Sequence, residues 1–487
     1  MLKLSPNYSE PLPAAFFPAS APPAFSRADF GPDFQWGASA AAYQTEGAWQ
    51  QQGKGASIWD DFTRRKGTIR RNEHGRVAAD FYNRYETDLD LAAGLGLTDF
   101  RFSVAWPRVL PEGTGAVNRR GLDYYDRLVD ACLERELRPL LTLYHWDLPS
   151  ALQVRGGWAN RDIVHWFADY AQTVARRLGD RVPQWCVLNE PMVFVGAGHL
   201  LGIHAPGRRH LGAFLAAAHH ATLAQAEGGR ALRAALPAAA QIGTTFSCSY
   251  LTPHRPDNAN DEAATRRADA LLNRFFVEPA LGLGYPLAEL PALRWLLARY
   301  QKPADDTLIK FDFDFWGIQN YTREVIRFSP WLPLQWAALV PAKKRQVPHS
   351  EMGWEVHPES IYQMLKHFSA YPNAPRLVVT ESGAAFPDVP TGPQVPDRAR
   401  RAYLQAALGQ VLRARREGVP VDGYFYWSLT DNFEWAEGYQ PRFGLIRVDY
   451  KTQLRSVKDS GLWYRDFLGG QEVSATVSEN RAVPAEN

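Results

Sequence analysis

Cysteine is scarce in this sequence, with only Cys132, Cys186 and Cys248 among 487 residues. Three cysteines are too few for a disulfide framework, and the odd count favours free, buried thiols in a reducing compartment. The sequence also has no run of about 18 apolar residues, the length that crosses a bilayer. We therefore expect a cytoplasmic protein without a membrane span.

An excess of charge of one sign is missing as well. The 54 Lys and Arg nearly balance the 52 Asp and Glu, which leaves a net charge of +2. A balanced surface does not gather polyanions, so nucleic acid is not expected as a partner. Hydrophobic residues make up 46% and charged residues 22%, values typical of a globular protein with a large core. Disordered and fibrous classes are excluded.

Two cofactor signatures are also absent. No Gly-rich phosphate turn follows the first expected strand, and the pair Gly94 and Gly96 lies at a helix-to-strand junction, the wrong order for a dinucleotide site. The pair His219-His220 lies in an Ala-rich stretch, and the sequence contains no His-Glu-x-x-His motif. We expect neither an organic cofactor nor a metal. A metal hydrolase remains an alternative that chelators would reveal.

The pattern that is present alternates short apolar runs with longer amphipathic stretches, which is typical of βα units. Eight strands are expected, at residues 34–39, 99–105, 138–145, 184–190, 241–247, 313–319, 376–381 and 423–429. Helices are expected at residues 82–95, 121–135, 161–178, 211–235, 261–276, 358–368 and 397–417. This count favours an α/β protein with a single (β/α)₈ TIM barrel, in which long βα loops form the mouth of the active site.

The expected domain organisation has three parts. A flexible extension rich in Pro and Ala covers residues 1–28, the barrel covers 29–470, and a polar tail covers 471–487. Long insertions follow the fifth and sixth strands and should build walls around the mouth. One of them, residues 329–354, contains the basic run Lys343-Lys344-Arg345, which we interpret as a solvated loop.

Several expected strands change from apolar to polar or aromatic residues at their C-terminal ends, where barrel active sites lie. Two of these ends carry glutamates, Glu190 and Glu381. Hydrolysis of a glycosidic bond needs one carboxylic acid and one carboxylate on opposite sides of that bond. Aromatic residues make up 13%, with 16 Trp, and flat rings suit the apolar faces of sugars.

The same residues lie within motifs that resemble glycoside hydrolase family 1, the family of β-glucosidases and β-galactosidases. The resemblance runs in unbroken order from about residue 34 to 467. Its motifs are Ala42-Tyr43-Gln44-Thr45-Glu46-Gly47, Phe100-Arg101-Phe102-Ser103, His145-Trp146-Asp147-Leu148-Pro149, Asn189-Glu190-Pro191, His204-Ala205-Pro206-Gly207, Thr380-Glu381-Ser382-Gly383, Tyr426-Trp427-Ser428-Leu429 and Asp431-Asn432-Phe433-Glu434-Trp435.

The resemblance implies a retaining, two-step displacement in which Glu190 is the general acid/base and Glu381 the nucleophile, with their carboxyls about 5 to 5.5 Å apart. Arg101 is implied to keep Glu381 ionised, and Tyr321 to touch it. The residues implied to surround the substrate are Gln44, His145, Asn189, Glu434 and Trp435 for the sugar, Trp427 as its stacking floor, Trp354 as the wall for the leaving group, and Phe443 as a supporting residue.

Some positions depart from the family pattern. Where the family often has Gly-x-Asn-Tyr-Tyr-Thr, this chain has Gln319 and Asn320 before Tyr321, and Ser382 replaces the usual Asn after the nucleophile. Members acting on 6-phosphorylated sugars carry Ser at the position of Glu434. A carboxylate there would repel a phosphate dianion, so we expect unphosphorylated glycosides or oligosaccharides as substrates.

Other questions stay open in the sequence. Glucose, galactose and fucose all fit the implied sugar-binding residues. A glycosyl-transferring enzyme would share every residue discussed, and a barrel that binds sugars without cleaving them is a further alternative. The oligomeric state is equally open.

Overall fold

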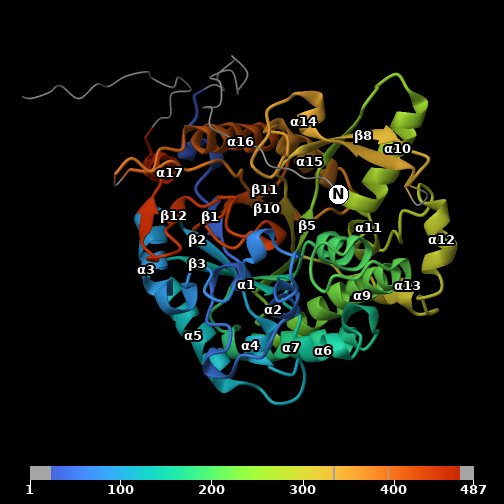
Figure 1. The fold of residues 1–487 in the computed structure, drawn as a ribbon, viewed down its shortest axis with the longest axis horizontal. Coiled ribbons are helices and arrows are strands. Elements are labelled where there is room, and N and C mark those ends of the chain that lie inside the picture. The colour runs from blue at the N-terminus through green and yellow to red at the C-terminus, as the bar shows by residue number, and fades with distance from the viewer. Residues whose placement is uncertain (1–23, 333–334, 393, 472–487) are drawn as a thin grey trace, which may run out of the picture.

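The computed structural model describes residues 24–332, 335–392 and 394–471. At its centre, eight parallel strands form a closed barrel in the spatial order β1-β11-β10-β7-β5-β4-β3-β2 (Figure 1). The barrel strands are β1 (Gln35–Ser39), β2 (Asp99–Ser103), β3 (Arg138–Tyr144), β4 (Gln184–Asn189), β5 (Gln241–Ser247), β7 (Phe315–Gln319), β10 (Arg376–Ser382) and β11 (Val421–Trp427). The predicted (β/α)₈ TIM barrel is confirmed, and every predicted strand overlaps an observed one.

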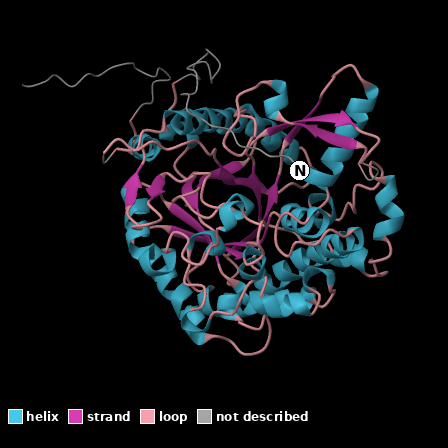
Figure 2. Cartoon of the chain, viewed as in Figure 1, coloured by secondary structure: helices cyan, strands magenta, loops and turns pink. Residues whose placement is uncertain are grey.

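Helices surround the barrel, as Figure 2 shows by the cyan ring around the magenta strands. They include α3 (Phe81–Gly94), α5 (Arg119–Glu134), α7 (Ile163–Leu178), α9 (Leu211–Ala235), α15 (Glu359–Ser369) and α16 (Arg398–Arg416). Each agrees with a predicted helix to within two residues. The predicted helix at 261–276 is instead α10 (Ala259–Asp269) followed by a π-helical turn over Ala270–Arg274.

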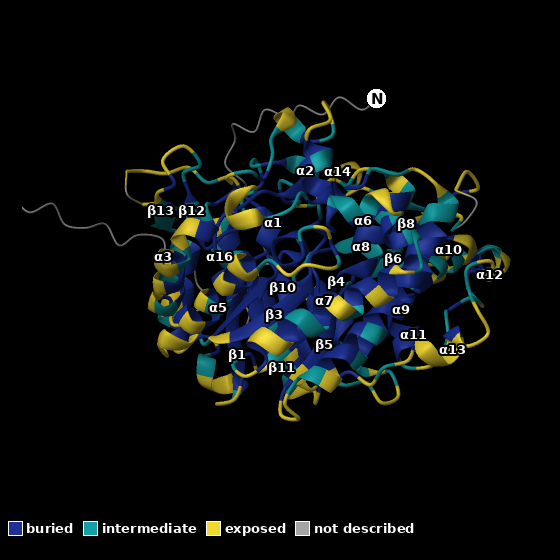
Figure 3. Ribbon diagram, turned by 90° about the horizontal axis from the view of Figure 1, so that it is seen from below, coloured by how far each residue is buried: buried dark blue, intermediate teal, exposed yellow. Residues whose placement is uncertain are grey.

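The interior of the barrel is filled by large side chains below the C-terminal rim. Phe315 and Phe425 form a buried cluster there; its other members are Leu140, Cys186 and Val378. Glycines clear the space for the two rings, because a Cβ on Gly37 would lie 2.2 Å from the Phe425 ring and one on Gly243 would lie 2.6 Å from the Phe315 ring. The barrel is therefore closed beneath the site, and its centre is buried (Figure 3).

Two small sheets and two helices lie in stretches that the sequence did not resolve into strands or helices. A three-stranded sheet outside the barrel joins β6 (Tyr250–Pro253), β8 (Arg323–Phe328) and β9 (Ala337–Val340), and α14 (Ala342–Arg345) follows it. A hairpin joins β12 (Ile446–Val448) to β13 (Arg455–Val457), and α17 (Asp459–Leu468) ends the described chain. Most residues of these strands are only partly buried, unlike those of the barrel strands, so no buried apolar run marks them in the sequence.

The predicted extension at 1–28 and tail at 471–487 lie mostly outside the described residues. Phe25 is buried, with its ring centroid 6.1 Å from that of Phe30 and 5.7 Å from that of Phe467. Arg27 donates a hydrogen bond of 2.9 Å to the Leu468 carbonyl. Packing on the barrel thus begins ahead of the predicted boundary at 29. Within the described ranges, none of the helices is both long and apolar enough to cross a bilayer.

Candidate active site

The two candidate glutamates lie at the C-terminal rim of the barrel, Glu190 directly after β4 and Glu381 near the end of β10. Glu190 has a left-handed backbone conformation, with φ of 48°, and its N–H donates to the Thr245 carbonyl on β5 at 3.0 Å. The strand stops there and helix α8 (Pro191–Val195) begins. Glu190 is 7% exposed and Glu381 3% exposed, so both carboxyls lie in a largely dry environment.

Glu381 accepts hydrogen bonds on both carboxylate oxygens. Arg101 on β2 donates to Oε1 at 2.5 Å, and the Gln319 amide on β7 donates to the same oxygen at 2.8 Å. The Tyr321 hydroxyl donates to Oε2 at 2.6 Å. One cation and two neutral donors therefore favour the ionised form of this carboxyl.

The two glutamates differ in their electrostatic surroundings. Burial raises the pKa of Glu190 well above its ordinary value, and the negative charge of Glu381 raises it further. Burial also raises the pKa of Glu381, but the Arg101 charge and the hydrogen bond from Tyr321 oppose that shift. The shared proton therefore resides on Glu190, and Glu381 remains the anion.

Asn189 connects the two glutamates to the sugar-binding residues. Its Oδ1 accepts from Arg101 at 2.6 Å, from Gln319 at 2.8 Å and from Thr245 at 3.1 Å. These donors fix the orientation of the amide, so its nitrogen must be the donor in the 3.1 Å contact with His145 Nε2. One amide N–H of Asn189 then remains for a substrate hydroxyl.

The tautomer of His145 follows from that contact. Its Nε2 accepts from Asn189, so the proton lies on Nδ1, a buried atom without a hydrogen-bond partner among the described residues. Burial, with the Arg101 charge added, lowers the pKa of His145 well below its ordinary value. The ring is neutral and presents an N–H donor rather than a charge.

Gln44 and Glu434 form the opposite side of the sugar-binding region. The Gln44 amide donates to the Asn432 side chain at 3.1 Å, to the Phe433 carbonyl at 3.0 Å and to Glu434 at 3.4 Å. Its own oxygen is buried and unpaired within the described part of the chain. Burial, with the Glu381 charge added, raises the pKa of Glu434 to about 8. Glu434 is thus protonated at neutral pH and can both donate and accept a hydrogen bond.

Aromatic rings complete this region. The His145 ring centroid lies 6.0 Å from that of Trp427 and 6.0 Å from that of Trp435, with 25° between the planes in each pair. Trp435 in turn packs on Trp146 at 4.6 Å and lies 6.1 Å from the nearly parallel ring of Tyr43. The sugar-binding residues therefore rest on a continuous aromatic cluster.

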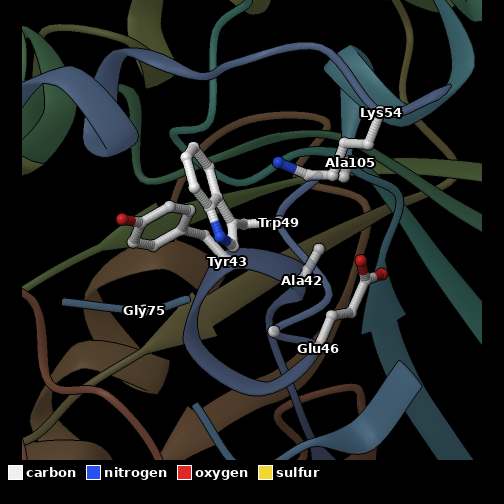
Figure 4. A pocket seen from close by; sticks show the side chains of 8 residues that line it. Ala42, Tyr43, Glu46, Trp49, Lys54, Gly75 and Ala105 are labelled. Atoms are coloured by element: carbon white, nitrogen blue, oxygen red, sulfur yellow. The ribbon is translucent and has the colours of Figure 1, made fainter. Parts of the chain in front are cut away.

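A cavity of about 10 Å³, room for one water molecule, is lined by Tyr43 and its neighbours Glu46, Trp49 and Lys54 (Figure 4). Asp147, two residues after His145, is also buried. Burial raises the pKa of its carboxyl to about 8, although the Lys54 charge opposes this shift. This carboxyl is therefore neutral at pH 7.

Trp354 packs beside Tyr321, the tyrosine that contacts the nucleophile. Its ring centroid is 5.4 Å from that of Tyr321 and 6.3 Å from that of Phe443, and Tyr321 and Phe443 are 6.0 Å apart. Tyr321 therefore contacts the nucleophile through its hydroxyl and the predicted leaving-group wall through its ring. The site residues predicted from the sequence all lie around the C-terminal rim of the barrel.

The departures from the family pattern have distinct structural roles. Gln319 spans the nucleophile and Asn189 through its amide nitrogen. Asn320 donates to the Cys248 carbonyl at 3.0 Å and accepts from Ser360 at 2.6 Å, so it links β7 to the neighbouring loop and to α15. Ser382 lies 3.4 Å from the Tyr403 hydroxyl of α16. Of the three, only Gln319 contacts the candidate catalytic groups.

Sequence reasoning missed two residues that organise the site. Thr245 binds Asn189 from β5, a strand whose end carries no acidic residue. Glu355, directly after Trp354, forms ion pairs with Arg323 and Arg345. The interpretation of Lys343-Lys344-Arg345 as a solvated loop is wrong for Arg345, whose side chain is 13% exposed. The signal in the sequence that could have pointed to Glu355 was an acidic residue directly after Trp354, the predicted wall for the leaving group.

Comparison with known proteins places this geometry among characterised enzymes. A family model described as Glycosyl hydrolase family 1 matches residues 26–472. Beta-glucosidase A of Thermotoga maritima is 43% identical over 90% of this chain and 97% of its own length. Beta-glucosidase A of Acetivibrio thermocellus is 39% identical over 91% of this chain and 99% of its own. The solved beta-glucosidase from Thermotoga maritima in complex with deoxynojirimycin has a TM-score of 0.87 and 42% identity, covering 90% of this chain and 98% of that chain.

Proposed function

The chain belongs to glycosyl hydrolase family 1, and we propose that it is a β-glucosidase in which Glu381 attacks the anomeric carbon and Glu190 transfers the proton. It is an O-glycoside hydrolase, and the retaining mechanism is general for its family. The observation that supports these roles is the asymmetry of the two buried carboxyls. Arg101 and Tyr321 stabilise the charge on Glu381, whereas burial and that same charge keep Glu190 protonated.

In the first step, Glu381 forms a bond to the anomeric carbon while Glu190 protonates the departing oxygen. Esterification removes the charge of Glu381, which is one of the causes of the raised pKa of Glu190. Glu190, which has given its proton to the departing oxygen, therefore remains ionised. It takes a proton from water as the water attacks the anomeric carbon, and the bond from that carbon to Glu381 breaks. An alcohol that replaces this water would yield a transfer product from the same intermediate.

The proposed substrates are unphosphorylated β-D-glucosides, with β-D-galactosides and β-D-fucosides as further possibilities within the same site. Burial raises the pKa of Glu434, and the charges of Glu381 and Glu437 raise it further. A phosphate dianion beside Glu434 would meet these charges and is disfavoured. A neutral hydroxyl finds donors and acceptors on Gln44, His145 and Asn189.

We also propose that the enzyme acts in the cytoplasm. Its three cysteines are all buried and free, which fits a reducing compartment.

The proposed function is tested with a panel of aryl β-glycosides, in which NMR follows the anomer that forms first. We expect the β-anomer of glucose to appear before mutarotation. A first product with α configuration would contradict the double displacement, and a panel without turnover would favour a barrel that only binds sugars. Added methanol should divert part of the product to methyl β-glucoside.

A further inference from the structure

Glu355 is held by two arginines beside the leaving-group wall. Arg323 donates to both of its oxygens, at 2.5 and 3.1 Å, and Arg345 lies 2.7 Å from Oε2. The Glu355 side chain is 5% exposed. Burial alone would raise the pKa of Glu355, but the hydrogen bonds from both arginines outweigh it and the pKa lies below its ordinary value. The carboxylate is therefore charged and tightly held.

The ion pair joins two segments that each carry an aromatic residue of the site. Arg323 lies two residues after Tyr321, and Glu355 directly follows Trp354. A second bond joins the same segments, because the Thr322 hydroxyl donates to the Glu355 carbonyl at 3.1 Å. The Tyr321 ring is fixed independently through its hydrogen bond to Glu381. The position of Trp354 relative to Tyr321 therefore depends on these contacts around Glu355.

The insertion between β8 and Trp354 supplies the second arginine. β8 begins at Arg323 and pairs antiparallel with β9, and the chain then enters α14, which ends at Arg345. Arg345 also donates to the Val340 carbonyl at 3.1 Å, which ties its guanidinium to the end of β9. Exposed ion pairs contribute little to structure, but a buried, bidentate arginine–carboxylate contact fixes the geometry of both partners.

We propose that Arg323, Glu355 and Arg345 are positioning residues that hold Trp354 against Tyr321 and thereby set the acceptance of the leaving group. This inference rests on the proposed function, since it assigns a role to the wall of the same site. The groups that this wall suits are sugar rings and aromatic or other apolar aglycones, which can stack on an indole face. The three residues are not among those predicted to contact the sugar in the first subsite.

The test compares substrates with and without a ring in the leaving group. Arg345→Met keeps the aliphatic stem and removes the second cation. We expect kcat/KM for cellobiose to fall by about tenfold, as a small displacement in a binding wall can do, and kcat/KM for β-glucosyl fluoride to change by less than about twofold. Active-site titration with a 2-deoxy-2-fluoroglucoside normalises each rate to the amount of competent enzyme.

Arg327→Met is the matched control, because Arg327 lies on the same strand, β8, but is exposed. It should leave both substrates unchanged. A double-mutant cycle with Trp354→Ala gives a second readout: once Trp354 is absent, Arg345→Met should cost less than about twofold on cellobiose. Equal losses on cellobiose and the fluoride, or additive losses in the cycle, would overturn the proposal. Lack of wild-type turnover on both substrates would instead refute the proposed function.

Discussion

The sugar side of the site and its leaving-group side are built differently. On the proposed sugar side, Gln44, His145, Asn189 and Glu434 are buried and come at or shortly after the ends of barrel strands. On the leaving-group side, Trp354 lies on a loop and depends on an ion pair with an insertion outside the barrel. The first arrangement is fixed by the fold itself, whereas the second can change without disturbing the barrel.

This difference separates two kinds of specificity. The sugar hydroxyls meet donors and acceptors whose orientations are set by other protein groups, such as the Asn189 oxygen with its three donors. The leaving group meets a ring surface, which tolerates many shapes. Substitutions on the sugar side should therefore affect all leaving groups alike, and those on the other side should affect them selectively.

The largest expected effect is that of Glu381→Gly, which removes the nucleophile and should affect every leaving group. We expect kcat/KM to fall on the order of 10⁴-fold or more for all aryl β-glucosides. Azide should restore part of the rate on activated substrates, because Arg101 keeps a buried positive charge beside the vacated space. Rates with and without azide check this, with α-glucosyl azide identified by NMR. An unchanged rate would reject the assignment of Glu381.

Glu190→Gln changes the group that protonates the oxygen between the sugar and the leaving group, so it tests how the two sides of the site differ. Without an acid, poor leaving groups such as glucose should lose about 10²- to 10⁴-fold in kcat/KM, and dinitrophenolate far less. Glu190 acts while protonated, so wild-type kcat/KM should fall as the pH rises through its raised pKa. The variant should lack this alkaline limb on the dinitrophenyl substrate. Equal losses for both leaving groups, or a retained limb, would contradict the role of Glu190.

The smallest expected effect is that of Glu434→Gln, which keeps the shape of the sugar side. We expect a loss of about tenfold in kcat/KM that is the same for all leaving groups. A loss in kcat/KM that varied with the leaving group would contradict the separation of sugar specificity from leaving-group specificity.

The same variant gives a stability test. The pKa of Glu434 rises from 4.5 to about 8 on folding, so between these values the folded protein holds a proton that the unfolded chain has released. Wild-type stability should therefore decrease as the pH rises across this window, and Glu434→Gln should remove that contribution. Calorimetry should show the variant gaining roughly a few degrees in Tm over wild type at pH 8.5 relative to pH 5. Glu359→Gln, on the surface of α15, is the control and should show no such gain.

The sequence predicted the barrel because its strands are short apolar runs and most of its helices are long and amphipathic. It predicted an active site at the C-terminal rim because polar residues such as Asn189-Glu190 and Glu381 lie at the ends of β4 and β10. The small sheet of β6, β8 and β9 could not be predicted in this way. Its strands are only partly buried and pair with segments up to about 70 residues away, so no local pattern marks them.

The resemblance implied which residues contact the sugar, but not how the protein orients them. Three donors occupy the Asn189 oxygen, and this leaves only its nitrogen for substrate. Arg345 was hidden for a different reason. In the sequence it continues a run of exposed lysines, and only the folded insertion brings it to Glu355.

The closed floor of the barrel affects how substrate enters the site and how product leaves it. Phe315 and Phe425 fill the interior below the rim, so a sugar that reaches the site meets a dead end. Such a shape suits the release of one terminal residue at a time, because a polymer cannot be threaded through. The freed glucose has to leave through the same opening that admits the next molecule. Entry and exit therefore compete, and accumulated product should slow the enzyme.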